Sequence, residues 1–343
     1  MRLTFSEIKN KIGKIVPEGL DYDVDLEAGS ISIITREPAS FGGAGGQSLT
    51  VKIAKAIRRR VVIRPHPELL SSETEVNDAV SRIMPSEAQI RRIWLDPALS
   101  EVTIEADDPK SAVGQKGTNI QQLRNEIGWL VNVVRAPARE SRTQTDIRRF
   151  RKELADERKT LLRKFGTRIY RPQRPGPSWA RVTALGSYRE VGRAMHLVTT
   201  NESKVLVDCG AKPTNNRSEV QPFFAAPEML PLDNIDAVVI THAHVDHIGM
   251  LPVLFRYGYK GPVYCTQPTR DLMTLLQMDY IKVAQAEGNE APYSKSDIQE
   301  CIKHVVDVNW GEKTDIAPDI KMTMENAGHI PVSYTHLTLP TKA

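Results

Sequence analysis

Three histidines and an aspartate lie within the nine residues THAHVDHIG, Thr241 to Gly249, immediately after the apolar run IDAVVI. A continuous apolar run of this length is typical of a strand that is buried on both faces of a sheet. Residues two apart in an extended segment point to the same side, so we expect His242 and His244 to project together. Asp246 and His247 follow where the chain turns into a helix, and they can face a neighbouring position. Zinc prefers nitrogen and oxygen ligands of this kind, so the run predicts a metal site at the end of a buried strand.

The segments around this cluster alternate between strands and helices. The stretch SKVLVDCG, Ser203 to Gly210, predicts a strand that ends at Asp208, and GPVYC, Gly261 to Cys265, predicts another. Pro268 to Ala286 has apolar residues at helical spacing. This alternation predicts a layered α/β domain around the cluster.

The length and composition favour a protein of two or three domains in a reducing compartment. With 343 residues, the chain can bury more than one core, and its apolar fraction of 40% and charged fraction of 26% are ordinary for a globular protein. No apolar run approaches the roughly 18 residues that a membrane helix needs, and the start lacks the features of a signal peptide. Cys209, Cys265 and Cys301 are far apart and odd in number. We therefore expect a cytoplasmic protein with no structural disulfide and no membrane partner.

One pattern of elements occurs twice in the first 136 residues. Each copy has the order helix, strand, strand, glycine-containing loop, helix and strand, and the second copy has a short extra helix before its loop. The first copy comprises a helix at 5–15, strands at 22–27 and 30–35, the loop FGGAGG at 41–46, a helix at 49–59 and a strand at 61–63. The second comprises a helix at 74–83, strands at 90–95 and 101–106, a short helix at 108–113, the loop GQKG at 114–117, a helix at 118–127 and a strand at 129–135.

The second copy, with GQKG between two helices, resembles the KH domain in its prokaryotic arrangement. Gly114 and Gly117 allow the backbone to approach a phosphate closely, the amides at the start of the next helix are donors, and Lys116 adds positive charge. The resemblance implies that Gly114, Gln115, Lys116 and Gly117 bind single-stranded RNA. The alternative is a turn between helices that binds no ligand. The loop of the first copy has no basic residue, which favours a structural turn and a degenerate KH-like unit.

Positive charge is concentrated between the second copy and the histidine cluster. Between Arg135 and Arg174 there are 14 Lys and Arg residues against 5 Asp and Glu residues. Apolar residues at helical spacing predict one amphipathic helix over Thr143 to Phe165 with a cationic exposed side. Such a helix can extend a nucleic-acid surface by releasing counterions, or it can be a solvated connector. The stretch Gly166 to Trp179 is rich in proline and glycine, which predicts a domain boundary.

The residues His242-Ala243-His244-Val245-Asp246-His247 resemble the H-x-H-x-D-H signature of the metallo-β-lactamase superfamily. Together with the tandem KH-like units and with ALGSYREVGRAMH at Ala184 to His196, they make the chain similar to the archaeal homologues of the cleavage and polyadenylation specificity factor nuclease. The resemblance implies two Zn²⁺ ions per complete active site, held by the metal ligands His242, His244, Asp246, His247 and His329. It also implies a catalytic role for Asp208 and Asp246, and Asp208 would steady the ligands from behind.

The activity implied by this resemblance is cleavage of RNA phosphodiesters, endonucleolytic or from 5′ to 3′, in 3′-end processing and transcription termination. A hydroxide held between two metals, its pKa lowered towards neutrality, would attack the phosphorus while the metals neutralise the developing charge. The implied partners are single-stranded RNA, the transcription machinery and a second copy of the chain, bound through a C-terminal region.

These observations predict a multidomain protein of mixed α+β and α/β class, with two KH-like αββααβ units followed by a partial metallo-β-lactamase αββα sandwich. The expected parts are a degenerate KH-like unit at 1–68, a type II KH domain at 69–137, a basic helix and linker at 138–178, an incomplete metallo-β-lactamase domain at 179–330 and a non-native tail at 331–343.

The sequence departs from the family pattern after His329. The family continues with a strand that ends in a metal-bridging aspartate and with an inserted β-CASP domain, whereas this chain reads IPVSYTHLTLPTKA. That tail resembles a translated vector or adapter, and His336 within it is not assigned as a ligand. Three ligands then remain for the first metal and two for the second. We therefore expect a C-terminally truncated fragment that binds zinc weakly and cleaves RNA little.

Two other functions are consistent with parts of the sequence. The chain can be a non-catalytic KH module, whose affinity for RNA survives chelation of the metal. It can instead be a small-molecule hydrolase of the glyoxalase or lactamase type that uses the same histidines. The basic KH-like half argues against the second alternative, because a small ester has no need of a nucleic-acid clamp.

Overall fold

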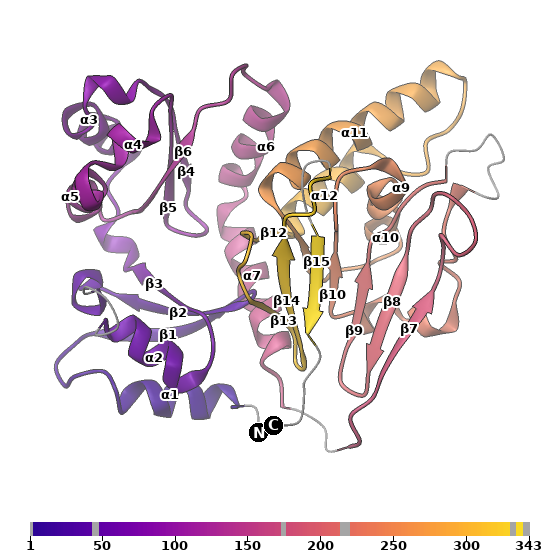
Figure 1. Ribbon diagram of the computed structural model, residues 1–343, viewed down its shortest axis with the longest axis horizontal. Coiled ribbons are helices and arrows are strands. Elements are labelled where there is room, and N and C mark those ends of the chain that lie inside the picture. Colours follow the sequence, from indigo (N-terminus) through magenta and orange to yellow (C-terminus); the bar gives the residue numbers. More distant parts are fainter. Residues whose placement is uncertain (1–2, 43–47, 173–175, 213–219, 330–333, 339–343) are drawn as a thin grey trace. The chain divides into compact units, whose positions relative to one another are not determined.

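The computed structural model describes residues 3–42, 48–172, 176–212, 220–329 and 334–338 (Figure 1). The chain forms two compact units, which divide between Thr160 and Leu161. The N-terminal unit comprises residues 5–26 and 30–160, and the C-terminal unit comprises the residues from 161 onwards with 27–29 and the first four residues.

The first half of the N-terminal unit is a three-stranded sheet with two helices. Its elements are α1 (Phe5–Gly13), β1 (Tyr22–Glu27), β2 (Ser30–Thr35), η1 (Pro38–Phe41), α2 (Leu49–Ile57), β3 (Val61–Pro65) and η3 (Pro67–Leu69). The strand order is β1-β2-β3, and β2 and β3 are parallel. The two helices pack against each other and bury Ile8, Ile12, Ile53 and Ile57. Residues 43–47 of the predicted FGGAGG loop lie outside the described residues.

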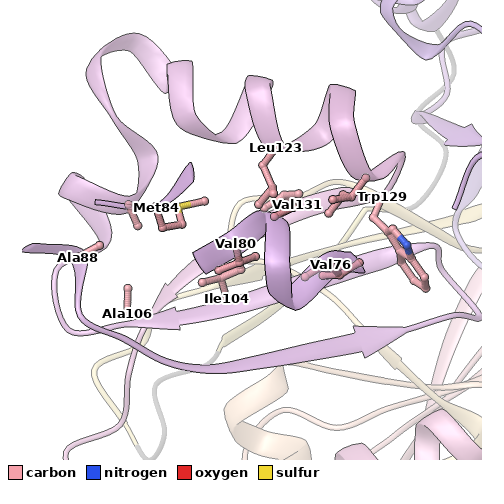
Figure 2. Close-up of a cluster of buried hydrophobic side chains, with 13 residues drawn as sticks. Val76, Val80, Met84, Ala88, Ile104, Ala106, Leu123, Trp129 and Val131 are labelled. Atoms are coloured by element: carbon pink, nitrogen blue, oxygen red, sulfur yellow. The ribbon is translucent and has the colours of Figure 1, made fainter. Parts of the chain in front are cut away.

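The second half of the N-terminal unit has the same kind of sheet. Its elements are α3 (Glu73–Ile83), η4 (Ser86–Ala88), β4 (Ile90–Asp96), β5 (Glu101–Ala106), α4 (Pro109–Val113), η5 (Gln115–Gly117), α5 (Thr118–Ile127) and β6 (Leu130–Arg135). β5 pairs antiparallel with β4 and parallel with β6. Local signals fix the ends of the helices: Ser72 and Glu75 form a capping box before α3, and Gly128 ends α5 in the left-handed conformation. Figure 2 shows the core, where Val80, Leu123 and Val131 meet between the helices and the sheet.

The predicted single helix over Thr143 to Phe165 is wrong. The chain forms two helices, α6 (Arg142–Glu153) and α7 (Ala155–Ile169), and Leu154 between them leaves the helical conformation with φ −99° and ψ 25°. Arg151 and Arg158, on either side of the break, both bind Asp96 of β4. A straight helix would keep these two positions about 10 Å apart along its axis. The regular apolar spacing continues across Leu154 and therefore does not reveal the break.

The C-terminal unit contains two sheets. The larger sheet has the order β12-β11-β10-β9-β8-β7 and the smaller has the order β13-β14-β15. The strands are β7 (Ala180–Ala184), β8 (His196–Thr200), β9 (Lys204–Val207), β10 (Ala237–Val239), β11 (Val263–Cys265), β12 (Val305–Asp307), β13 (Thr314–Ala317), β14 (Ile320–Glu325) and β15 (Tyr334–Thr338). β9 to β12 are parallel neighbours, whereas β7, β8 and β9 are antiparallel, as are β13, β14 and β15. The helices are η6 (Pro227–Met229), η7 (Leu232–Asn234), α9 (Val245–Ile248), α10 (Leu251–Arg256), α11 (Gln267–Ala286) and α12 (Lys295–His304).

Alternating side chains of the larger sheet face two different layers. Val205, Ala237 and Val239 pack against Ile316 and Met322 of the smaller sheet. Their neighbours Leu206 and Val238 point the opposite way and are also fully buried. Helices α10, α11 and α12 cover that second face, and α12 contacts both of the others (Figure 1). Burial on both faces explains why the strand before the histidines is continuously apolar.

The mixed α/β multidomain class is therefore confirmed. The described residues contain no helix long and apolar enough to cross a bilayer. Of the predicted tail, 331–333 and 339–343 lie outside the described residues, and the backbone of 334–338 pairs with β14.

Leu123 tests the core shown in Figure 2, since its side chain is fully buried there. Leu123→Ala should lower the free energy of unfolding of this module by about 2–5 kcal/mol, because it removes apolar contacts and leaves a cavity. Leu69→Ala, at a residue that is 39% exposed, should cost less than about 1 kcal/mol. Urea denaturation followed by circular dichroism compares them, and equal losses would contradict this account of the core.

Candidate metal centre and nucleic-acid interface

The predicted metal-site residues lie at the carboxyl ends of three strands. Asp208 directly follows β9, and the segment from Thr241 to His247 follows β10 after one intervening residue. β9 and β10 are parallel, with Val207 opposite Val239, so both strands end at the same edge of the sheet. His329 comes from the segment after β14. The fold therefore brings together residues that are far apart in the sequence.

Three imidazoles converge at this edge. His242 Nε2 is 3.1 Å from His244 Nδ1, and His329 Nε2 is also 3.1 Å from His244 Nδ1. One ligand atom of each histidine lies within 4.8 Å of the others. His242 is buried, His244 is half-buried and His329 is exposed. All three histidines are among the five metal ligands that were predicted from the sequence.

The chemistry of this donor set fits a transition metal. In a tetrahedral site with Zn–N bonds of about 2.0–2.1 Å, neighbouring ligand atoms are about 3.3 Å apart, and the two short nitrogen separations here are close to that value. Imidazole nitrogens suit Zn²⁺ among the divalent metals. Three protein ligands also leave a fourth position open, as catalytic zinc sites do.

Asp246 and His247 lie beside the three imidazoles. The ring centroids of His242 and His247 are 4.0 Å apart, and His247 Nε2 is 3.7 Å from Asp246 Oδ2. His247 Nδ1 is hydrogen bonded to Asp208 Oδ2 at 2.8 Å, so Nε2 is the nitrogen that remains for a metal. The pair offers one nitrogen and one oxygen to a neighbouring position.

Asp208 lies next to the histidine cluster and is 4% exposed. Its carboxylate accepts hydrogen bonds from Thr241 N at 2.8 Å and from Thr241 Oγ1 at 2.9 and 3.0 Å, in addition to its bond with His247. The residue has φ 62°, a left-handed conformation that is uncommon outside glycine. This geometry gives Asp208 a positioning role, because its oxygens are directed at the residues that carry the ligands.

A close approach of two backbone segments supports α9 and the turn before it. Cys209 N donates to His247 O at 2.8 Å, and Ala211 N donates to Val245 O at 3.0 Å. A Cβ atom on Gly210 would lie 1.6 Å from Asp246 O. Only glycine allows this contact, so Gly210 helps to hold the segment that carries Asp246 and His247 in place.

The two histidines next to Asp208 have opposite pKa shifts. Burial, with the positive charge of His247 as the next cause, lowers the pKa of His242 to about 4. Burial alone would lower the pKa of His247 as well, but the hydrogen bond and the charge of Asp208, with Asp246, outweigh burial and raise it. Metal ligands must be deprotonated, so His242 is ready to bind a metal at neutral pH, whereas a proton competes more strongly at His247.

The GQKG loop has the backbone that its glycines predict. Gly114, Lys116 and Gly117 all have positive φ, at 74°, 52° and 81°. A Cβ on Gly114 would lie 2.7 Å from Asn119 Cγ, whereas one on Gly117 would meet nothing within 4 Å. Gln115 and Lys116 are exposed. The loop thus presents a cation and open backbone directly before α5, whose first amide, Thr118 N, donates to Gln115 O within the loop.

Much of the basic segment between Arg135 and Arg174 binds acidic residues within its own unit. In the N-terminal unit Arg148 pairs with Glu105 and lies over Trp94 at 4.8 Å, and Arg158 binds Asp96 at 2.9 Å. In the C-terminal unit the acceptor is Asp236, which binds Arg168 Nε at 2.8 Å and Arg171 Nη1 at 2.7 Å. These cations stabilise the fold, and the predicted nucleic-acid surface cannot depend on them.

Thr241 was not predicted from the sequence as a site residue. Its hydroxyl lies 2.9 Å from His242 Nδ1 as well as within hydrogen-bonding distance of Asp208. A threonine before a histidine carries no signal by itself, because its role depends on Asp208, which is 33 positions away in the sequence. This contact becomes visible only when β9, the strand before Asp208, is placed next to β10.

The pKa shifts predict the order in which the histidines of the metal-free protein titrate. The pKa of His242 should be about 4, and the pKa of His247 should be higher than that of an ordinary histidine. Asp208→Asn should lower the pKa of His247, because it removes the charge that favours the imidazolium. NMR titration of the ring C–H signals measures both values. If the pKa of His247 were the same in the wild type and the variant, Asp208 could not be the cause of its shift.

Comparison with known proteins gives two domain assignments. Residues 197–333 match the metallo-beta-lactamase superfamily domain, a fold that implies metal binding. Residues 2–70 match the KH domain of transcription termination factor FttA. The KH match thus falls on the unit that the sequence analysis regarded as degenerate.

Relatives carry the same name across several archaea. The chain is 42% identical over 335 residues to transcription termination factor FttA of Methanosarcina mazei, covering 96% of this chain and 52% of the relative. It is 40% identical over 331 residues to FttA of Thermococcus kodakarensis, covering 94% and 51%. Among solved structures, the metallo-beta-lactamase fold protein YhfI of Bacillus subtilis matches 46% of this chain and 57% of its own, with 20% identity and a TM-score of 0.27 that is too low to support a structural argument.

The chain spans about half the length of the curated relatives that it matches. The two domain matches and the sequence identity to several FttA proteins nevertheless point to the same family, and the identity extends over most of this chain. By these matches the chain contains a KH domain and a metallo-β-lactamase superfamily domain, and over most of its length it is similar to the archaeal transcription termination factors FttA.

Proposed function

We propose that this chain provides the RNA-binding loop and most of the metal ligands of a zinc-dependent ribonuclease that acts in transcription termination. The observation that carries the proposal is the convergence of His242, His244 and His329, at nitrogen separations suited to zinc, in a protein that also has a KH domain. The name of the relatives supports the role in termination.

In this proposal the five predicted ligands form two neighbouring sets. His242, His244 and His329 hold the first Zn²⁺, and Asp246 with His247 contributes to the second. Bound zinc supplies Lewis-acid stabilisation of negative charge and lowers the pKa of water. The chain's own contribution is to fix the imidazoles: Asp208 orients His247 directly, and the strand ends hold the remaining ligands at one edge of the sheet. The substrate is RNA, cut internally or from its 5′ end.

The RNA-binding residues of the proposal are Gly114, Gln115, Lys116 and Gly117. Both glycines lack a side chain and adopt the positive φ that this turn requires, so the backbone that a phosphate would approach is uncovered there, and Lys116 is exposed beside it. We place this loop in a second KH domain at 69–137, after a KH-like unit at 1–68 and before a metallo-β-lactamase domain at 179–330. A cytoplasmic location, a homodimer and contacts with the transcription machinery belong to the same proposal.

The loop can be tested by RNA binding alone. Gly114→Asp combined with Gly117→Asp should weaken binding of a single-stranded RNA at least tenfold, because the added carboxylates repel phosphate and both positions have a positive φ. Lys116→Ala should weaken binding less and reduce the slope of log affinity against log salt by about 1. Lys295→Ala removes an exposed lysine of α12 and serves as the control with matched charge. Fluorescence anisotropy at several salt concentrations gives all three values, and equal effects of the two lysine variants would argue against a specific role for the loop.

The metal centre is tested by RNA cleavage. Zn²⁺-dependent turnover of a 5′-labelled single-stranded RNA, which should be slow because this chain supplies only part of the ligands, should disappear on chelation and in a variant with His242→Ala and His244→Ala. RNA affinity should survive both changes, because it depends on phosphate contacts. Cleavage that persists in the double variant would contradict the proposed ligands. Turnover of a small lactone or thioester that is unaffected by the glycine substitutions would instead favour a small-molecule hydrolase.

A further inference from the structure

Thr241 connects a buried carboxylate to a metal-site histidine. Its backbone amide donates to Asp208 Oδ1 at 2.8 Å, and its hydroxyl oxygen lies 3.0 Å from Oδ1 and 2.9 Å from Oδ2 of the same carboxylate. The same hydroxyl oxygen lies 2.9 Å from Nδ1 of His242. The side chain of Thr241 is half-buried, and both of its partners are buried.

The direction of these hydrogen bonds follows from the number of protons. An ionised carboxylate can only accept, so the single proton of the Thr241 hydroxyl must point towards Asp208. The hydroxyl oxygen then offers only lone pairs to His242, and Nδ1 of His242 must be the donor. In the reverse arrangement, the hydroxyl would donate to His242. Thr241 Oγ1 and the carboxylate oxygens of Asp208 would then face each other without a proton between them.

We propose that the Thr241 hydroxyl relays the acceptor character of Asp208 to His242, fixes the Nδ1–H tautomer of that ring and so presents Nε2 as its metal-binding atom. This inference rests on the proposed metal centre and deepens it. Nε2 of His242 is the atom that lies 3.1 Å from Nδ1 of His244. With the other tautomer, a proton on Nε2 would stand where the metal has to bind.

One carboxylate thus orients two ligands by two routes. Asp208 binds Nδ1 of His247 directly at 2.8 Å, and it reaches Nδ1 of His242 through Thr241. Both rings are left with Nε2 free for a metal. His244 differs, because its Nδ1 faces Nε2 of both His242 and His329. In this proposal His242 and His247 bind a metal through Nε2, whereas His244 binds through Nδ1.

The test compares Thr241→Val with Thr241→Ser. Valine keeps the shape and the backbone amide that binds Asp208 but removes the hydroxyl, whereas serine keeps the hydroxyl. Thr274→Val is the matched control, because Thr274 is a buried threonine whose hydroxyl donates to the backbone carbonyl of Arg270 in α11. Circular dichroism and thermal unfolding establish that each variant is folded.

Two measurements distinguish a relay from a merely structural role. Competition with a chromophoric chelator should show zinc affinity reduced about 10- to 100-fold in Thr241→Val and little changed in Thr241→Ser and Thr274→Val. Long-range ¹H–¹⁵N NMR of the metal-free proteins, at a pH where the imidazoles are neutral, should show Nδ1 of His242 protonated in the wild type and in Thr241→Ser. In Thr241→Val, the proton should shift towards Nε2.

Each outcome has one meaning. If Thr241→Val kept both the wild-type zinc affinity and the wild-type tautomer, the relay would be overturned and the proposed ribonuclease would be unaffected. Loss of affinity in Thr241→Ser as large as in Thr241→Val would also overturn it, because the hydroxyl would then not be the cause. If the wild type showed the Nδ1–H tautomer but bound no zinc, the relay would stand and the proposed metal centre would fail.

Discussion

The parallel register of β9 and β10 is the constraint on which the metal site depends. Val205 pairs with Ala237 and Val207 with Val239, and the side chains of both strands are buried against layers on either side. A shift of one residue would turn every side chain to the opposite layer, which the packing opposes strongly. The same register places Asp208, the next residue after β9, beside Thr241. Core packing, which has no chemical role, therefore sets the distance between the carboxylate and the ligand-bearing segment.

Buried charge in the C-terminal unit holds elements of the fold together. Asp236 stands directly before β10, is 3% exposed, and binds Arg168, Arg171 and the backbone amide of Lys204. A buried carboxylate without such partners would be strongly unfavourable, so these arginines are needed where they are. For this reason the net charge of residues 135–174 overstates the cationic surface that they offer to RNA. The exposed lysine of a glycine loop is better evidence than the charge of the whole segment.

The sequence predicted those features that depend on local signals. The strands at 22–27, 30–35 and 101–106 and the helix at 118–127 were predicted with the bounds that the structure has, because turns, caps and alternation mark their ends. The group His242, His244 and His329 was predicted from a family motif, and the structure brings these residues together. The break at Leu154 was missed because the apolar spacing continues across it, and the contacts of the flanking arginines with Asp96 join positions more than 50 residues apart. Thr241 was missed for the same reason, since its meaning comes from a distant carboxylate.

The arrangement of charges around the histidines bears on the kind of substrate. The three imidazoles of the first set carry no charge when they bind a metal, so a divalent cation there keeps its full positive charge. The nearest buried carboxylate, Asp208, is directed away from them at Thr241 and His247, and its charge is partly balanced by those donors. Asp246 is the one carboxylate among the five proposed ligands, so two divalent cations held by them would keep a net positive charge, which attracts anionic groups more strongly than neutral ones. Under the proposed function, this edge of the sheet would therefore favour an anionic ligand such as a phosphodiester, and the KH domain in the same chain favours the same class of ligand.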